Sequence, residues 1–404
     1  MRAGGNPDHA WSGHTNTLAG GSDIFPGTYP GLVPNETDSA AHWRDIRRLL
    51  NSSRHELAVR AAQLYPAVPR VGGTPLLTTP QWLPPAPLDL GEVALAWADA
   101  APPGADVSGT ASAHLRPRQA SGDRYASYAE ALAAIERPAL LENRPIYRLL
   151  SASLSGSPPL LRLTSARYFD WVNGGEALAH ELTSAWRQRP DKISGPARLR
   201  LRTLVGNPGD LPGRCTLSAV TTLTLRVPAT GEPTFVLHWR DPAAVTHAGG
   251  LYQVMPVGVF QPAGEGPVAR ARDLDLWRCV AREFSEEFLG TGENYGGPVD
   301  YDRWPFFGEL SAARAAGKLR VWCLGLGADP LTLAVDVLCV AAVSSDVFDA
   351  LFGGLVEVNT EGRVMAGVPF TAGVVDRFAA REAMQPAGAA VLELAWEHRK
   401  LLLG

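Results

Sequence analysis

The side chains best suited to chemistry lie in one ten-residue stretch, residues 281–290, which reads Ala-Arg-Glu-Phe-Ser-Glu-Glu-Phe-Leu-Gly. On a helix, Glu283, Glu286 and Glu287 occupy positions i, i+3 and i+4, so their side chains project from one patch. Three carboxylates this close repel one another unless a cation lies among them. Hard divalent ions such as Mg²⁺ prefer oxygen ligands, often a few carboxylates together with phosphate oxygens of a substrate. The patch therefore predicts one half of a site for a metal and a diphosphate.

The residues around the patch indicate how a helix could hold it. One side of the predicted helix is apolar and is expected to be buried, because four large residues recur at every fourth position: Leu276, Val280, Phe284 and Phe288. Asp273 or Asp275 is suited to cap the N-terminus, and Gly290 to end the helix. Arg282 stands four residues before Glu286, so we expect the two to pair along the helix and orient that carboxylate.

The segment Arg282–Glu287 resembles the second half of the Nudix box, G-x5-E-x7-R-E-U-x-E-E-x-G-U, where U is a bulky apolar residue. The resemblance implies a cofactor of Mg²⁺ or Mn²⁺ bound by Glu283, Glu286 and Glu287. It also implies catalytic roles for Glu283 and Glu287, one of them as the base, with Arg282 as the arginine that orients the carboxylates. The implied reaction is hydrolysis of a nucleoside diphosphate linked to another group, or of a related diphosphate.

The first half of the box is different in this chain. Leu274 stands where the family has a glutamate, with Asp273 and Asp275 on either side, and Val268 stands where it has a glycine. Gly290 comes one residue later than the family's second glycine. Two alternatives to a hydrolase therefore remain: a catalytically weak or inactive ligand-sensing protein, and a biosynthetic enzyme that uses the scaffold for other chemistry. The plainest alternative is a solvated acidic helix end.

Composition narrows the class of protein. The chain has 404 residues, 46% of them hydrophobic, and a net charge of −4, which gives no overall electrostatic footprint for nucleic acid. Its four cysteines are widely separated and show neither disulfide nor zinc spacing. We find no apolar signal core and no run long enough to span a membrane. These features predict a cytoplasmic protein with free thiols and leave the oligomeric state open. The small-molecule diphosphate ligand is implied by the glutamate patch and by the Nudix resemblance.

The chain order predicts an α+β protein, because strands, a helix, more strands and further helices follow one another in the C-terminal half. The Nudix resemblance covers roughly residues 215–404 and implies an α/β/α sandwich with a mixed sheet. We expect a flexible arm at 1–37, a helical and irregular region at 38–160, and at 161–404 a Nudix-like domain with an N-terminal helix and a long insertion after the glutamate helix. From Trp43 onward the chain also resembles a group of actinobacterial multi-domain proteins labelled transcriptional regulators, but we identify no DNA-binding domain in front.

Hydrophobic periodicity predicts the individual elements. Residues 38–65 are expected to form one helix, or two helices broken near 51–53. Further helices are expected at 128–135, 147–154, 168–186, 310–316, 347–352, 374–381 and 389–403. Strands are expected at 88–98, 216–227, 234–239, 252–260, 319–326 and 331–343. The alternation at 198–202 predicts an edge strand whose three arginines are either solvated or in contact with phosphate. Glu176 and His180, four residues apart, are either an ordinary helix pair or half of a metal site.

Overall fold

The computed structural model describes residues 37–100, 110–138, 140–189, 195–240, 250–292, 298–355, 358–359 and 362–404. Residues Thr37–Gly404 form one compact unit. Apart from Thr37, the predicted arm lies outside the described residues, as does part of the insertion after the glutamate helix. No helix in the described ranges is both long and apolar enough to cross a membrane.

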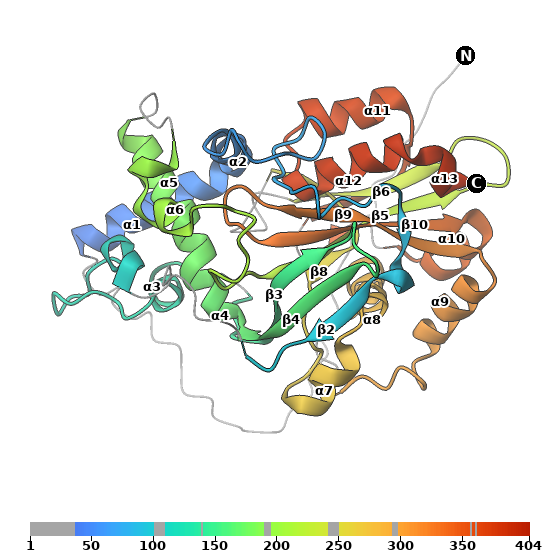
Figure 1. Ribbon diagram of the computed structural model, residues 1–404, viewed down its shortest axis with the longest axis horizontal. Coiled ribbons are helices and arrows are strands. Elements are labelled where there is room, and N and C mark those ends of the chain that lie inside the picture. The colour runs from blue at the N-terminus through green and yellow to red at the C-terminus, as the bar shows by residue number, and fades with distance from the viewer. Residues whose placement is uncertain are drawn as a thin grey trace, which may run out of the picture. The chain divides into compact units, whose positions relative to one another are not determined.

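A mixed sheet runs through this unit (Figure 1). In spatial order its strands are β1 (Leu88–Asp89), β9 (Leu319–Ala328), β10 (Val335–Ser344), β5 (Ser218–Val227), β6 (Thr234–Arg240), β12 (Gly362–Pro369) and β11 (Val358–Asn359). Two short strands, β7 (Tyr252–Val254) and β8 (Val257–Val259), pair with β6 and β5. The centre is mixed, because β10 is parallel to β5 and antiparallel to β9. The predicted α+β class, with a mixed sheet, is confirmed.

The central strand β10 is buried on both faces, which explains its continuous apolar sequence. Val337, Cys339 and Ala341 belong to one hydrophobic cluster, whereas Leu338 and Val340 belong to a second. Helix α12 (Pro386–Glu397) packs on the second cluster, while α8 (Leu276–Glu283), α9 (Pro305–Ala315) and α10 (Ser345–Phe352) pack on the first. Figure 1 shows α12 on one side of the sheet and α8 on the other. The sheet therefore lies between two helical layers.

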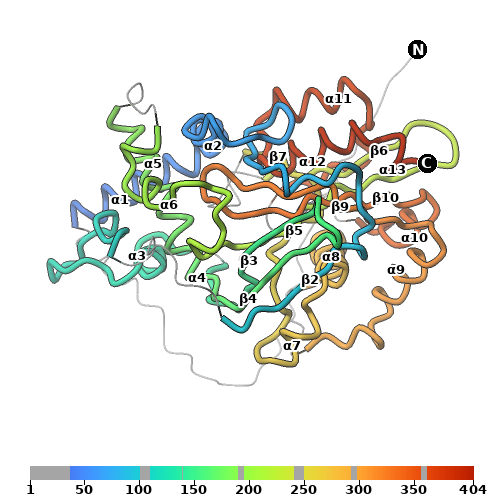
Figure 2. Tube along the Cα trace, viewed as in Figure 1, coloured from blue at the N-terminus to red at the C-terminus, as the bar shows by residue number. Residues whose placement is uncertain are grey.

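A second sheet of three strands contains β2 (Ala94–Trp97), β4 (Leu160–Arg167) and β3 (Pro145–Ser153), which Figure 2 shows side by side. The helix predicted at 147–154 is wrong, because this segment is β3. A bulge at Leu149/Ser151 interrupts the alternation of buried and exposed residues in the strand. The buried residues therefore come in two pairs, 146–147 and 149–150, which is the spacing expected of a helix. The domain boundary predicted at 160/161 falls at the start of β4, whose partners β2 and β3 precede it.

Most of the predicted helices are present. They are α1 (Asp38–Ser52), α2 (Arg54–Gln63), α3 (Tyr128–Ile135), α4 (Tyr168–Trp171), α5 (Ala177–Gln188), α9, α10, α11 (Ala372–Asp376), α12 and α13 (Arg399–Leu403). Of the two alternatives for residues 38–65, the structure has the two helices, with Ser53 between them. A π-helical turn, Val172–Glu176, joins α4 to α5. Helix α7 (Gly266–Asp273) and strands β11 and β12 were not predicted.

The basic edge strand predicted at 198–202 is wrong. Residues Pro196–Arg198 form a 3₁₀ turn and Arg200–Val205 form helix α6. The alternation fails because Arg202 is fully buried and donates hydrogen bonds to the carbonyls of Pro330 and Leu331, at 2.8 and 2.6 Å. The side chain of Glu181 accepts the backbone N–H of Leu201, which satisfies a donor of the first helical turn. Arg202 therefore has a structural role.

Glu176 and His180 lie in a buried cluster between the N-terminal helices. The Glu176 carboxylate pairs with Arg47 at 2.5 Å and with Arg54 at 2.9 Å. His180 Nδ1 lies 3.2 Å from the Tyr128 hydroxyl, and its ring stacks on Trp43. Burial lowers the pKa of His180 to about 3, and Arg47 and His42 add to this effect. These contacts favour the helix-pair interpretation over a metal site, because two arginines engage the carboxylate.

Candidate metal and phosphate site

The glutamate helix forms as predicted in its first half. Asp275 is the N-cap of α8 and accepts the backbone N–H of Arg278 at 3.0 Å. The apolar side is buried, as expected, at Leu276, Val280, Phe284 and Phe288. Gly290 has φ = +68°, a conformation that favours glycine and is suited to ending a helix. The predicted cap, stripe and terminal glycine are therefore confirmed.

The second half of the helix differs from the prediction. Residues Phe284–Phe288 form a π-helical turn, so the hydrogen-bond spacing widens just where Glu286 and Glu287 lie. Phe284 and Phe288 both contact Phe352 of α10, with ring centroids 5.1 and 4.9 Å apart. Single π-helical turns occur frequently at functional sites. The i, i+3, i+4 geometry of an undisturbed α-helix does not describe this patch.

Two of the glutamates lie over strand β8. A Cβ added at Gly258 would come within 1.9 Å of the Glu283 carboxyl carbon, so this side chain lies directly against the strand backbone. The backbone N–H of Val257 donates to Glu287 Oε1 at 3.3 Å. Glu283, Glu286 and Glu287 are all half-buried. The glycine of β8 therefore makes room for a carboxylate that is held close to the sheet and still reaches solvent.

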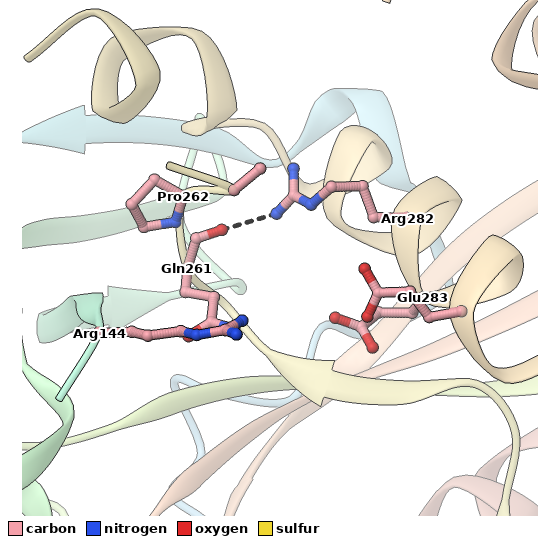
Figure 3. Close-up of a pocket in the computed structure, with 7 residues that line it drawn as sticks. Arg144, Gln261, Pro262, Arg282 and Glu283 are labelled. Atoms are coloured by element: carbon pink, nitrogen blue, oxygen red, sulfur yellow. Dashed lines mark hydrogen bonds between the residues drawn. The ribbon is translucent and has the colours of Figure 1, made fainter. Parts of the chain in front are cut away.

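A pocket opens beside these carboxylates (Figure 3). The pocket is small, with a volume of about 10 Å³, which is room for about one water molecule, and it is partly open to solvent. Its lining residues come from both halves of the chain: Arg144, Gln261, Pro262, Ala263, Arg282, Glu283 and Glu286. In Figure 3, Arg144 and Gln261 lie across the space from Glu283. The helix therefore contributes two carboxylates and Arg282 to the lining, and Arg144 lies across the space from Glu283.

Arg282 belongs to a buried hydrogen-bond network. Its guanidinium donates to the Tyr301 hydroxyl at 2.5 Å and to the Gln261 carbonyl at 2.6 Å, and lies 3.5 Å from Asp273. Tyr301 in turn donates to Asp273 Oδ1 at 2.7 Å, while the N–H of Ala263 donates to Oδ2 at 2.8 Å. Burial raises the pKa of Tyr301, which keeps the hydroxyl protonated as a donor. The network joins α7, α8, the loop after β8 and the segment that contains Tyr301.

These contacts show whether either aspartate beside Leu274 could take the role that a glutamate has at that position in the Nudix pattern. Asp273 is fully buried, and both of its oxygens accept hydrogen bonds. The Asp275 side chain caps α8. Each carboxylate is thus engaged in holding the helix, and neither lines the pocket. The first acidic position of the Nudix box has no substitute among these two residues.

The structure brings the predicted site residues together only in part. Glu283, Glu286 and Arg282 line one pocket, whereas Glu287 contacts the backbone of β8. Within the described ranges, no three His, Cys, Asp or Glu side chains form a group that could hold a metal ion. Half-exposed carboxylates are still the donor type that Mg²⁺ prefers. The metal assignment remains a prediction. The predicted pairing of Arg282 with Glu286 is wrong, because the guanidinium engages Tyr301, Gln261 and Asp273 instead.

Sequence reasoning missed Arg144, Gln261 and Gly258. Arg144 precedes β3 by one residue, and the resemblance to the Nudix box did not reach that part of the chain. The short apolar run Val257–Val259 did contain a signal, because a glycine inside a strand often marks close approach of another group. The predicted free thiols are confirmed: all four cysteines are unbridged. Burial, with Glu283 adding to it, raises the pKa of Cys279, so the thiol nearest the site stays protonated.

The chain matches no protein-family model and no curated protein. The case for a function therefore rests on the residues of the site itself.

Proposed function

We propose that this protein is a Mg²⁺-dependent hydrolase of Nudix type that cleaves the phosphoanhydride of a nucleoside diphosphate linked to another group, or of a related diphosphate. The observation that carries the proposal is the placement of Glu283 and Glu286 on one wall of a pocket, with Glu287 one residue further along the same helix. Acidic oxygens beside a space that is partly open to solvent, with Arg144 across it, suit a cation and a phosphate together.

Each residue has a defined part in this proposal. Glu283 and Glu286 would hold the metal, Glu287 would be the third ligand, and Glu283 or Glu287 would accept the proton of the attacking water. Mg²⁺ (or Mn²⁺), when bound, supplies charge to polarise the phosphate and activates the water. Arg282 keeps α8 at a fixed position against the loop after β8 through Gln261 and Tyr301. It therefore acts as a positioning residue.

The architecture agrees with the proposal. A mixed sheet lies between two helical layers, and α8 packs against β5 and β8. A Nudix-like α/β/α sandwich has the same layers and presents its glutamate helix from one of them. We retain a cytoplasmic location and a small-molecule diphosphate ligand as parts of the proposal.

A second candidate is a ligand-sensing protein with little or no turnover. The specific observation in its favour is the engagement of Asp273 and Asp275 in the packing and capping of α8, with Leu274 between them. A site with fewer acidic groups than the family's can still bind a metal and a diphosphate, but it provides fewer groups for catalysis. A sensor gains stability from its ligand without consuming it.

Product analysis separates the two candidates. Purified protein is incubated with Mg²⁺ and a panel of nucleoside diphosphate derivatives, nucleotide sugars, dinucleotide cofactors and prenyl diphosphates. A hydrolase releases phosphate or a mononucleotide from at least one compound, and chelation of the metal or Glu283→Gln lowers the rate ~10²-fold or more. Glu309→Gln, at an exposed position on α9, serves as the control and keeps the wild-type rate.

Two other results point away from a hydrolase. Thermal stabilisation by one compound without any product supports the sensor. No product together with no stabilisation by any compound contradicts both candidates. Arg282→Ala is a poor probe of turnover, because its removal leaves the buried Asp273 without its arginine and weakens the fold itself.

A further inference from the structure

We propose that four exposed arginines, at the end of α5 and the start of α6, bind the phosphate backbone of a nucleic acid. They are Arg187, Arg189, Arg198 and Arg200, and together they are called the arginine surface below. None of them belongs to the glutamate helix or lines its pocket, so the inference does not rest on the proposed function. The net charge of −4 is a sum over the whole chain and does not describe the charge of one surface.

Acidic residues are absent from the described segments that carry the arginine surface. The ranges 183–189 and 195–204 contain five arginines and neither aspartate nor glutamate. Arg202 is buried and bonded to backbone carbonyls, whereas the other four arginines are exposed. The side chains of these four make no ion pair with any residue of the described ranges. Their positive charge is therefore not neutralised within the part of the chain that the structure describes.

A contact between α5 and α6 brings the four arginines near one another. Glu181 of α5 accepts the backbone N–H of Leu201, in the first turn of α6, at 2.8 Å. Arg187 follows Glu181 by six residues, or ~9 Å along the helix axis, while Arg198 and Arg200 come shortly before Leu201. Figures 1 and 2 show α5 and α6 side by side. The four charges are therefore gathered within roughly 20 Å.

Helix stability accounts for only part of this arrangement. Arg187 lies in the last turn of α5, where the helix dipole favours a cation. Arg198 and Arg200 lie before and at the first position of α6, where the dipole disfavours a cation. A bound anion would offset this unfavourable interaction.

The chemistry of the arginine surface favours a nucleic acid over a lipid membrane. Guanidinium groups bind phosphate through two parallel hydrogen bonds, and a DNA duplex carries one negative charge per ~1.7 Å of its axis. Membrane-binding helices also present a broad apolar face, whereas Leu204 is the one large apolar residue exposed in the ranges 183–189 and 195–204. Because phosphates are the same in every sequence, we expect binding that depends on salt and not on base sequence.

The experiment measures the binding of a fluorescein-labelled DNA duplex by fluorescence anisotropy at a series of salt concentrations. Four phosphate contacts predict that the logarithm of the association constant falls with the logarithm of the salt concentration at a slope of about −3.6. The double variant Arg198→Gln and Arg200→Gln should weaken binding at low salt at least ~10-fold and make the slope shallower by ~2.

The control is a second double variant, Arg377→Gln and Arg381→Gln. It removes the same charge from exposed positions, but here each arginine pairs with a carboxylate, that of Glu382 or Asp376. We expect this control to keep the wild-type affinity and slope. Since all four substituted side chains are exposed, both double variants should stay folded, and thermal unfolding checks this.

Three results overturn the inference. The first is that the wild-type protein does not bind the duplex at low salt. The second is equal weakening in the two double variants, because net charge and not the arginine surface would then govern binding. The third is competition by phosphatidylserine vesicles or by polyglutamate that is as effective as competition by unlabelled duplex, because the assignment to nucleic acid would then be wrong.

Discussion

Two networks in this molecule are built from the same parts. In the N-terminal cluster, Arg47 donates to the Tyr128 hydroxyl at 3.4 Å and to Glu176 at 2.5 Å. Beside the pocket, Arg282 donates to the Tyr301 hydroxyl at 2.5 Å, and both side chains engage Asp273. Each network also adjoins a π-helical turn, Val172–Glu176 in one case and Phe284–Phe288 in the other.

The surroundings of the two networks differ. The N-terminal cluster is closed: its carboxylate is engaged by two arginines, and His180 and Tyr128 fill the space next to it. The network of Arg282 has three half-exposed glutamates and a pocket next to it. An arginine, a tyrosine and an acid in contact are therefore no sign of function by themselves. The informative feature is a set of carboxylates held against a strand with solvent in front.

The largest expected effect is a loss of stability when the buried ion pairs of the N-terminal cluster are broken. Glu176→Gln leaves Arg47 and Arg54 without their negative partner, and breaking a buried ion pair costs ~3–5 kcal/mol. Urea denaturation should show this loss in the free energy of unfolding, while the folded fraction still binds metal as the wild type does. The control is Glu56→Gln, whose exposed pair with Arg60 is expected to contribute ~0.5 kcal/mol or less. Equal losses in both variants contradict the account of the cluster.

Gly258→Ala tests the site beside the pocket. Unlike Glu176→Gln, it is expected to lower metal affinity and to change stability little. The added Cβ collides with the carboxyl end of Glu283, a flexible group that can move away, so stability is expected to fall by ~1 kcal/mol or less. Metal affinity should fall at least ~10-fold, as is typical when a ligand loses its support. Gly308→Ala on α9, where an added Cβ meets nothing within 4 Å, should leave metal affinity unchanged. Its stability should rise by ~0.5–1 kcal/mol, because alanine is the better helix former. Wild-type metal affinity in Gly258→Ala argues against Glu283 as a ligand.

A pH-dependent effect on stability is expected from His180. Burial lowers its pKa to about 3 in the folded protein, against ~6.5 in an unfolded chain. Below about pH 6.5 the unfolded state takes up a proton at His180, whereas the folded state does not. The contribution of neutral His180 to the free energy of unfolding is therefore fully present above pH ~6.5 and is lost as the pH falls towards ~3. His180→Phe should make the dependence of unfolding free energy on pH shallower by ~1.4 kcal/mol per unit between pH 6 and 4. Parallel profiles for the two proteins show that His180 is not held neutral.

Regular elements were predictable where burial follows a simple period. The stripe of Leu276, Val280, Phe284 and Phe288 identified the glutamate helix, and the long apolar run around Val337 identified a central strand. The prediction failed where local geometry breaks the period. The bulge at Leu149/Ser151 gives a strand the spacing of buried residues that is typical of a helix. Arg202 is buried, although the alternating sequence around it is typical of a strand with solvated arginines.

Only the glutamates of the helix, on one side of the pocket, could be predicted from the sequence. Adjacent glutamates on one helix are visible in the sequence, because their spacing is local. The opposite wall depends on contacts between distant segments, and nothing near Arg144 shows that it faces Glu283 from 139 positions away along the chain. The use of Asp273 inside a network with Tyr301 is equally a product of tertiary packing.

The central claim is that the glutamate helix binds a divalent cation, and calorimetric titration with Mg²⁺ or Mn²⁺ tests it most directly. The wild-type protein should bind metal at ~millimolar concentration or below, with hard oxygen ligands. Glu283→Gln and Glu287→Gln should abolish binding without unfolding the protein, and Glu309→Gln should bind as the wild type does. Absence of metal binding in the wild-type protein, or unchanged binding in both site variants, contradicts the claim.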